Sequence, residues 1–241
     1  ARSRPHRGHL QRQGRRGQEH GGRWEREREE TRVVLGSPRV NPARLPPSLP
    51  PVNIAVALAA AGVRVGLLDA DVHGPSVPRL LGLRAAPQPS LDSSNRLVPL
   101  RNYGVRALSM GMLIEPAKAA LWRGPMVMSA IETLTRRADW GGTDLLLLDM
   151  PPGTGDAHLS VAQRLPLVGA VVVTTPSSVA ADDAARGAAA WAAAGVPILG
   201  VVENMGPAAC AACGAEGSVF GEGGAAALAA AGLAAPLLAT V

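Results

Sequence analysis

The 241-residue chain is poor in aromatic residues, in cysteine and in lysine. Aromatic side chains make up 2% of the residues, so the core of a single α/β domain has to be aliphatic, which the hydrophobic content of 47% allows. No apolar stretch is long and uncharged enough for a transmembrane helix, because even the Ala-rich run 180–194 is short and contains Asp182, Asp183 and Arg186. Membrane contact is therefore expected to be peripheral at most.

The cysteines are two, Cys210 and Cys213, which is too few for the disulfide framework of a secreted chain. Their C-x-x-C spacing favours a metal or redox pair in a reducing compartment. Two thiolates are half of a four-ligand set, and a symmetric homodimer would bring two such pairs together. A [4Fe–4S] cluster shared across a dimer suits this arrangement, and Cys₄ zinc is the alternative.

The positive charge of the chain is confined to its first part. Residues 1–51 contain 12 Arg and 5 Glu, a formal charge of +7, whereas residues 52–241 carry −2. Residues 1–51 are rich in Arg, Gly, Glu and Pro without apolar periodicity, so we predict that they are disordered. A basic tail can bind nucleic acid or serve in targeting. The negative charge of the remainder counts against a nucleic-acid partner.

From Val52 onward, apolar runs of strand length alternate with segments of helix-forming residues. This order predicts a three-layer α/β fold with a mostly parallel sheet covered by helices on both faces. Ligands of such sheets bind at the carboxyl ends of the strands. We expect helices over 52–61, 125–138, 178–194 and 224–231, and strands over 63–68, 105–110, 145–148, 169–174 and 196–202.

Acidic residues stand at the ends of two of the expected strands. Asp69 and Asp71 lie in LLDADVHGPSVP, and Asp149 lies in LLLLDMPPGTGD. A carboxylate at the tip of a buried strand can hold Mg²⁺ through water beside bound phosphates. The segment Pro151–Asp156 (PPGTGD) that follows Asp149 resembles a switch loop that senses a γ-phosphate, because its prolines fix φ and its glycines permit tight turns.

Several motifs follow one another along residues 52–241: DADVHGPSVP (69–78), WRGPMVMSA (122–130), WGGTDLLLLDMPPGTGD (140–156), Asn204-Met205 and the C-x-x-C pair. In order and spacing they resemble the Mrp-type branch of the ParA/MinD P-loop ATPases. Within that branch, RGPMVMSAIETL and NYGVRALSMG look most like the mitochondrial members that help to mature the iron–sulfur centres of respiratory complex I.

The resemblance implies a role for each matching position. Asp71 is similar to the switch I aspartate that positions the attacking water, and Asp149 to the Walker B residue that orders the Mg²⁺ shell. Gly153, Thr154, Gly155 and Asp156 resemble switch II, Asn204 the residue that contacts adenine, and Cys210 and Cys213 the cluster ligands. We therefore predict Asp71 and Asp149 as catalytic, Cys210 and Cys213 as metal ligands, and a site for ATP with Mg²⁺ formed by Asp69, Gly153, Thr154, Gly155, Asp156 and Asn204.

The chain departs from the family at the phosphate-binding loop. A deviant Walker A motif, GKGGVGKST, should precede the helix at Val52, but the single lysine of the chain is Lys118. His9–His20 (HLQRQGRRGQEH) is compatible with codons that, read one nucleotide later, encode ICSGKGGVGKST. We therefore expect residues 1–51 to derive from a misread frame and noncoding sequence, and residues 52–241 to form an Mrp-type ATPase domain without its P-loop and its C-terminal end.

The function implied by the resemblance is ATP-dependent carriage of [4Fe–4S] clusters to iron–sulfur apoproteins, with complex I subunits as recipients and the mitochondrial matrix as location. One alternative is a ParA/MinD-like positioning ATPase, which would not need Cys210 and Cys213. Another is a binding module without catalytic activity, because the chain lacks the Walker A lysines. A nucleic-acid-binding protein, based on the basic tail, is a third.

Overall fold

The computed structural model describes residues 32–37, 50–114, 121–151, 156–209, 212–218 and 220–241, with only the backbone of 32–37, 50 and 156–157. Within these residues, one eight-stranded sheet has the order β10-β7-β6-β1-β5-β2-β4-β3. All neighbouring strands are parallel except β3, which pairs antiparallel with β4. The strands are β1 Arg32–Ser37, β2 Val65–Asp69, β3 Leu100–Asn102, β4 Val105–Ser109, β5 Leu145–Asp149, β6 Leu167–Thr174, β7 Ile198–Glu203 and β10 Leu237–Thr240.

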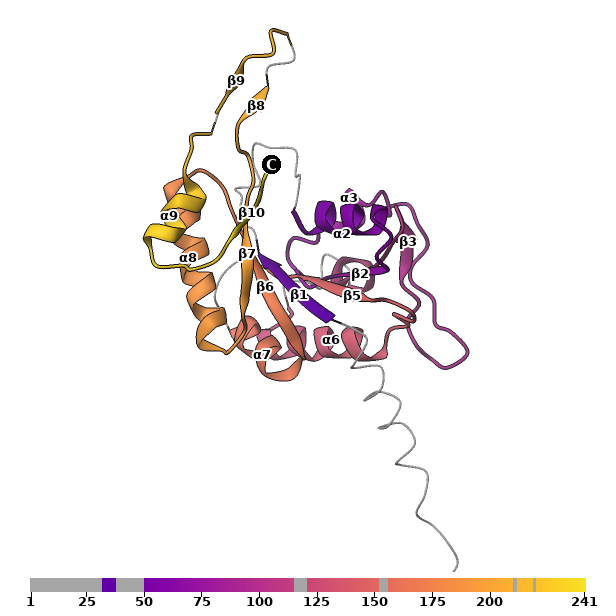
Figure 1. Ribbon diagram of the computed structural model, residues 1–241. Coiled ribbons are helices and arrows are strands. Elements are labelled where there is room, and N and C mark those ends of the chain that lie inside the picture. The colour runs from indigo at the N-terminus through magenta and orange to yellow at the C-terminus, as the bar shows by residue number, and fades with distance from the viewer. Residues whose placement is uncertain (1–31, 38–49, 115–120, 152–155, 210–211, 219) are drawn as a thin grey trace, which may run out of the picture.

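Helices connect the parallel strands and cover both faces of the sheet (Figure 1). They are α2 Pro50–Ala60, α3 Val77–Leu80, α4 Met110–Leu113, α6 Gly124–Arg137, α7 Asp156–Arg164, α8 Ser178–Ala193 and α9 Gly224–Ala230. The expected fold class is confirmed, and each expected helix and strand is found within a few residues of its predicted bounds. None of the helices in the described part of the chain is both long and apolar enough to cross a membrane.

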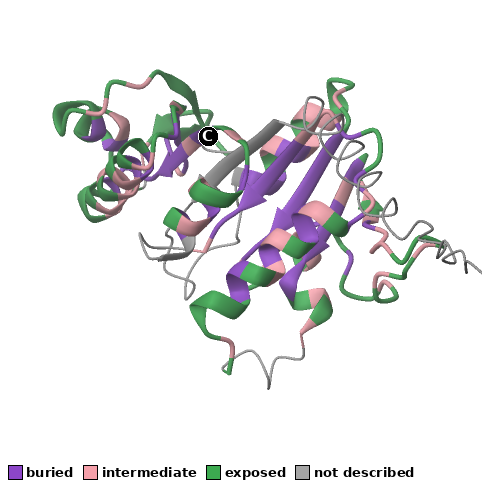
Figure 2. Cartoon of the chain, turned by 90° about the horizontal axis from the view of Figure 1, so that it is seen from below, coloured by how far each residue is buried: buried purple, intermediate pink, exposed green. Residues whose placement is uncertain are grey.

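Alternate side chains of the central strands pack on opposite faces, as the period of a strand requires. In β5, Leu147 packs with α2 on one face, whereas Leu146 and Leu148 pack with α6 and α7 on the other. The strands are accordingly buried and the outer sides of the helices are exposed (Figure 2). The run of four leucines is therefore explained by a strand that has a core on both sides.

Strand β1 departs from the disorder expected for residues 1–51. Arg32–Ser37 lies in the middle of the sheet, parallel to β5 on one side and to β6 on the other. The segment RVVLGS contains three consecutive β-forming or apolar residues, and a position between two buried strands satisfies its backbone hydrogen bonds. The expectation of disorder is wrong for these six residues, and α2 begins at Pro50, not at Val52.

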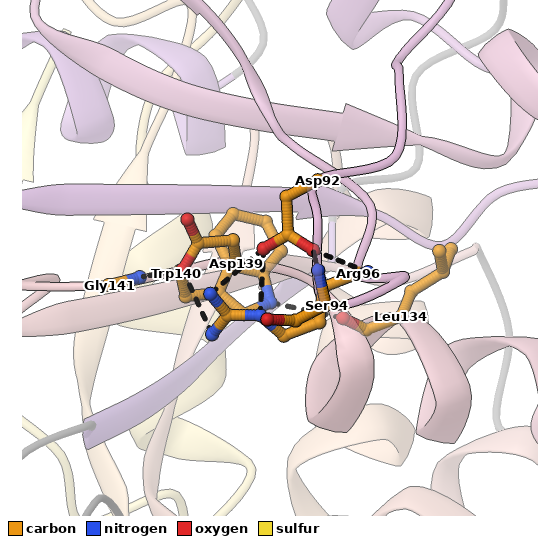
Figure 3. Close-up of polar contacts among 7 residues, drawn as sticks. All are labelled: Asp92, Ser94, Arg96, Leu134, Asp139, Trp140 and Gly141. Carbon is orange, nitrogen blue, oxygen red and sulfur yellow. Dashed lines mark hydrogen bonds and ion pairs between the residues drawn. The ribbon is translucent and has the colours of Figure 1, made fainter.

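A polar clasp fixes the connection from α3 to β3 against the end of α6 (Figure 3). Arg96 forms ion pairs with Asp92 at 2.9 Å and with Asp139 at 3.2 Å. The indole Nε1 of Trp140 donates to the carbonyl of Leu134 at 3.0 Å, so the ring is held in the core beside β2. These contacts hold the turn between α6 and β5, and β5 ends at Asp149.

Candidate functional site

Three predicted carboxylates lie at one edge of the sheet, at the carboxyl ends of adjacent strands. Asp69 is the last residue of β2 and Asp149 the last of β5, and the two are register partners. Asp71 follows two residues after β2. The parallel pairing of the strands, which their apolar sequences favour, is what brings these acids together.

Asp69 is fully buried and its carboxylate accepts several hydrogen bonds. One oxygen accepts from the backbone N–H of Asp71 at 3.1 Å. The other accepts from the N–H groups of Ser76 and Val77 and from the hydroxyl of Ser109 at 2.9 Å. Burial raises the pKa of Asp69 to about 6, against the lowering effect of these bonds. Asp69 thus holds the loop that presents Asp71 and the start of α3.

Asp149 is also buried, at 6% exposure. Burial raises its pKa well above the ordinary value, and the negative charges of Asp69 and Asp71 raise it further. Two buried carboxylates beside a third acid form a site where positive charge is favoured. The chemistry of the oxygen donors therefore fits a hard cation such as Mg²⁺.

Asp71 is less buried than its two neighbours and organises its own loop. One carboxylate oxygen accepts from the backbone N–H of His73 at 2.9 Å and of Gly74 at 3.0 Å. In the described residues, no group of three His, Cys, Asp or Glu side chains is arranged as a metal-ligand set. The role expected for these three acids, holding Mg²⁺ through water, stays a prediction.

In the sequence, the residues that join β1 to α2 stand where a phosphate-binding loop is expected. Gly36 in β1 is the register partner of Asp149, so the chain leaves β1 beside that carboxylate. Residues 38–49 (PRVNPARLPPSL) contain four prolines, no glycine and no lysine. Proline has no N–H to donate, and non-glycine residues resist the turns of an amide cradle. The residue types of this segment therefore do not fit a bound triphosphate.

Asn204 lies at the same edge of the sheet, directly after β7. It is buried at 5% exposure, and its backbone N–H donates to the carbonyl of Thr174 at 2.9 Å. Three strands, β6, β1 and β5, separate it from β2. Gly153, Thr154 and Gly155 lie outside the described residues, and Asp156 is the first residue of α7.

The segment that contains Cys213 follows β7 in the chain. A two-stranded ribbon of β8 (Ala208–Ala209) and β9 (Glu216–Gly217) stands clear of the sheet (Figure 1). Cys213 lies in the turn between them as an exposed free thiol. Cys210 lies outside the described residues. An exposed thiol on a projecting ribbon can reach a ligand that a second molecule also contacts.

Two residues of the site were not predicted from the sequence. Ser109, the last residue of β4, donates to Asp69, and its place at a third strand end would have singled it out. Glu203, the last residue of β7, is buried and accepts from the N–H of Ala225 at 2.6 Å. The sequence feature that could have identified Glu203 is an acidic residue at the end of the apolar run of β7, directly before Asn204.

Comparison with known sequences gives one matching protein family and relatives with similar names. The family model described as "ParA: NUBPL iron-transfer P-loop NTPase" matches residues 48–241. The "Iron-sulfur protein required for NADH dehydrogenase, mitochondrial" of Arabidopsis thaliana is 50% identical over 175 residues, which are 72% of this chain and 55% of that protein. The "Iron-sulfur cluster carrier protein" of Helicobacter pylori is 46% identical over 170 residues, 70% of this chain and 46% of that protein. The chain thus spans about half the length of the curated relatives it matches.

Comparison with solved structures supports the same fold. A nucleotide-binding protein from Archaeoglobus fulgidus in complex with ADP aligns with a TM-score of 0.70 and 30% identity, over 89% of this chain and 84% of that one. The septum site-determining protein MinD of Pyrococcus horikoshii aligns with a TM-score of 0.58 and 17% identity, over 88% of this chain and 81% of that one. The second likeness concerns the fold alone. With a family match over residues 48–241, relatives near 50% identity and a three-layer sheet of the same fold, the chain belongs to the ParA family of P-loop NTPases, in its NUBPL iron-transfer group.

Proposed function

We propose that the protein carries [4Fe–4S] clusters, held by Cys210 and Cys213 of two copies in a homodimer, and delivers them to iron–sulfur apoproteins. The observation that carries the proposal is the exposed thiol of Cys213 on a ribbon that projects from a nucleotide-type fold. Four thiolates complete the ligand set of such a cluster, and one chain supplies two. The Helicobacter pylori relative is named as an iron–sulfur cluster carrier protein, which supports this cargo.

The finer parts of the proposal are the recipient and the compartment. The Arabidopsis relative is named for a requirement of mitochondrial NADH dehydrogenase. We infer complex I subunits as recipients and the mitochondrial matrix as the location. A reducing compartment also suits two cysteines that would otherwise be oxidised to a disulfide.

The nucleotide half of the site is proposed to be incomplete in this chain. Asp69, Asp71 and Asp149 fit a hydrated Mg²⁺, but the segment 38–49 lacks the lysines and glycines that would bind phosphates. Binding of the cluster uses the thiolates, so this part of the proposal does not depend on a phosphate-binding loop. We therefore propose that this chain carries clusters but does not turn over ATP itself. This proposal combines the cluster-carrier function with the alternative of a binding module without catalytic activity.

The test is anaerobic reconstitution of the 241-residue chain with ferrous iron and sulfide, followed by visible absorbance, iron and zinc analysis and size determination. We expect about four iron atoms per dimer and transfer of the cluster to an added apo-ferredoxin. The variant with both Cys210→Ala and Cys213→Ala should bind none, and His73→Ala, an exposed potential ligand elsewhere, should behave as the parent chain. An absence of iron-dependent absorbance would favour a positioning ATPase, and stoichiometric zinc in place of iron would favour the Cys₄ zinc alternative.

A further inference from the structure

Residues 205–223, here called the cysteine arm, contain Cys213, and the regular structure in the described part of the arm is the short ribbon of β8 and β9. Its ribbon has two paired positions, Ala208 with Gly217 and Ala209 with Glu216. Every described residue from Pro207 to Gly217 is exposed. Because these residues do not pack against the sheet, the position of Cys213 depends on how the two stems of the arm are anchored.

The outgoing stem is anchored by backbone hydrogen bonds at the end of β7. The N–H of Asn204 donates to the carbonyl of Thr174 at 2.9 Å. The N–H of Gly206 donates to the carbonyl of Val241 at 3.0 Å, and the N–H of Val241 donates to the carbonyl of Glu203 at 2.8 Å. The backbone of Glu203 is thus part of the anchor of this stem.

The returning stem is anchored at the start of α9. Gly224 lies so close to the carbonyl oxygen of Thr175 that a Cβ there would overlap it. The next residue, Ala225, donates its N–H to the Glu203 carboxylate at 2.6 Å. The start of a helix has unpaired N–H groups, and a carboxylate that accepts from one of them is a charge-assisted cap.

We propose that Glu203 is the positioning residue of the cysteine arm. Its carbonyl accepts from Val241, whose own carbonyl accepts from Gly206 in the outgoing stem. Its carboxylate accepts from Ala225 next to the returning stem, so one residue contributes to the anchors of both stems. A metal-binding constellation has to be held within about 0.5 Å of its working geometry by such supporting groups. The inference rests on the proposed cluster carriage, because it concerns the position of Cys213 when two copies of the chain bind one cluster.

The test compares Glu203→Ala, Glu203→Gln and Glu203→Asp with the parent chain, each reconstituted anaerobically with iron and sulfide. Glutamine keeps an acceptor oxygen at the same reach, whereas aspartate keeps the charge but is one methylene shorter. Glu216→Ala removes an exposed carboxylate from the arm itself and is the matched control. The readouts are the visible spectrum of the cluster, its rate of loss to an iron chelator, and amide hydrogen exchange.

We expect Glu203→Ala and Glu203→Asp to lose the cluster about tenfold faster, the effect of one charge-assisted hydrogen bond. The rate of cluster loss from Glu203→Gln should stay within about threefold of the rate of the parent chain, because a threefold change corresponds to less than half the free energy of a tenfold change. The rate of Glu216→Ala should equal that of the parent chain. Equal loss rates in all variants would overturn the proposal, as would Glu203→Gln behaving like Glu203→Ala. If Glu203→Ala does not fold, the Gln and Asp pair decides the question alone.

Hydrogen exchange separates this inference from the proposed function. Faster exchange in residues 204–209 and 220–226 is expected for Glu203→Ala and Glu203→Asp, with no change in β2 and β5. A parent chain that binds no cluster would refute the carrier function, yet the exchange of the stems would still show whether Glu203 anchors them. Unchanged exchange of the stems in Glu203→Asp would refute the anchoring, whatever the parent chain binds.

Discussion

Asp69 and Asp149 are register partners at the ends of two parallel strands, and both carboxylates are buried. Their proximity raises the pKa of Asp149 beyond the effect of burial alone. A folded protein that keeps two acids in this position loses stability when both ionise. Ionisation of both acids at this edge of the sheet therefore lowers the stability of the fold, and a bound cation would offset that loss.

Asp149→Asn is expected to raise the free energy of unfolding at pH 8. The folded-state pKa of Asp149 is raised, so its contribution is fully present below the unfolded pKa of about 4 and is lost as pH rises through the folded pKa. For scale, the shift of the Asp69 pKa from 3.8 to about 6 corresponds to about 3 kcal/mol. Denaturation at pH 8 and pH 4 should show a gain of about 1–3 kcal/mol that shrinks at the lower pH.

Asp144→Asn is the control for this experiment, at the other end of the same strand. Asp144 pairs with Arg64, and hydrogen bonds from Arg64 lower the pKa of Asp144 to about 2. A lowered pKa stabilises the fold above the unfolded value, so this variant should lose stability at pH 8. A stability gain in Asp144→Asn, or a pH-independent effect in Asp149→Asn, would contradict the assignment.

Gly66→Ala is expected to destabilise the fold by about 1–3 kcal/mol. A Cβ at Gly66 would stand 2.8 Å from the ring of Trp140 and 2.9 Å from a methyl of Leu146, both in the core. Trp140 cannot withdraw easily because its indole N–H is bound to the carbonyl of Leu134. Thermal or denaturant unfolding measures the loss.

The same substitution at Gly187 should change the free energy of unfolding in the opposite direction. Gly187 lies inside α8, and a Cβ there would meet nothing within 4 Å. Alanine is the better helix former by about 0.8–1 kcal/mol, so Gly187→Ala should be stabilising. If both variants were destabilised equally, the close packing of Gly66 against Trp140 would not be the cause.

The chain with this sequence is expected to show no turnover of Mg-ATP. Residues 38–49 follow β1, which pairs with the strand that ends at Asp149, and they contain four prolines and no lysine. Replacing them with GKGGVGKST should bring nucleotide binding back, because β1 and α2 already lie at the two ends of that connection. Phosphate release and nucleotide binding are the measurements. Turnover by the unaltered chain that disappears in Asp149→Ala would refute the prediction.

The nucleotide sequence upstream of the codon for Val52 should encode ICSGKGGVGKST in the frame one nucleotide after that of His9–His20. This expectation comes from the codon degeneracy of HLQRQGRRGQEH and from the absence of lysine before α2. Transcript reads that span this region are the measurement. Codons that give another peptide in that frame would end the hypothesis and leave residues 1–51 as a divergent segment.

The sequence by itself determined the layered fold and the chemistry of the strand ends. Apolar runs of strand length, such as Leu145–Leu148, that alternate with helix-forming segments favour a covered parallel sheet, which places Asp69 and Asp149 at one edge. The C-x-x-C spacing identified Cys210 and Cys213 as a pair of candidate metal ligands. These inferences are local, because they depend on periodicity and on spacing within a few residues.

The tertiary structure decided what depends on contacts between distant segments. The segment RVVLGS carries no strong strand signal, and only the place between β5 and β6 accounts for β1. The roles of Ser109 and Glu203 come from partners 40 and 22 residues away in the sequence. A hydrogen bond between remote residues leaves no periodic pattern in either one, so packing alone revealed how Asp69 is held and how the cysteine arm is anchored.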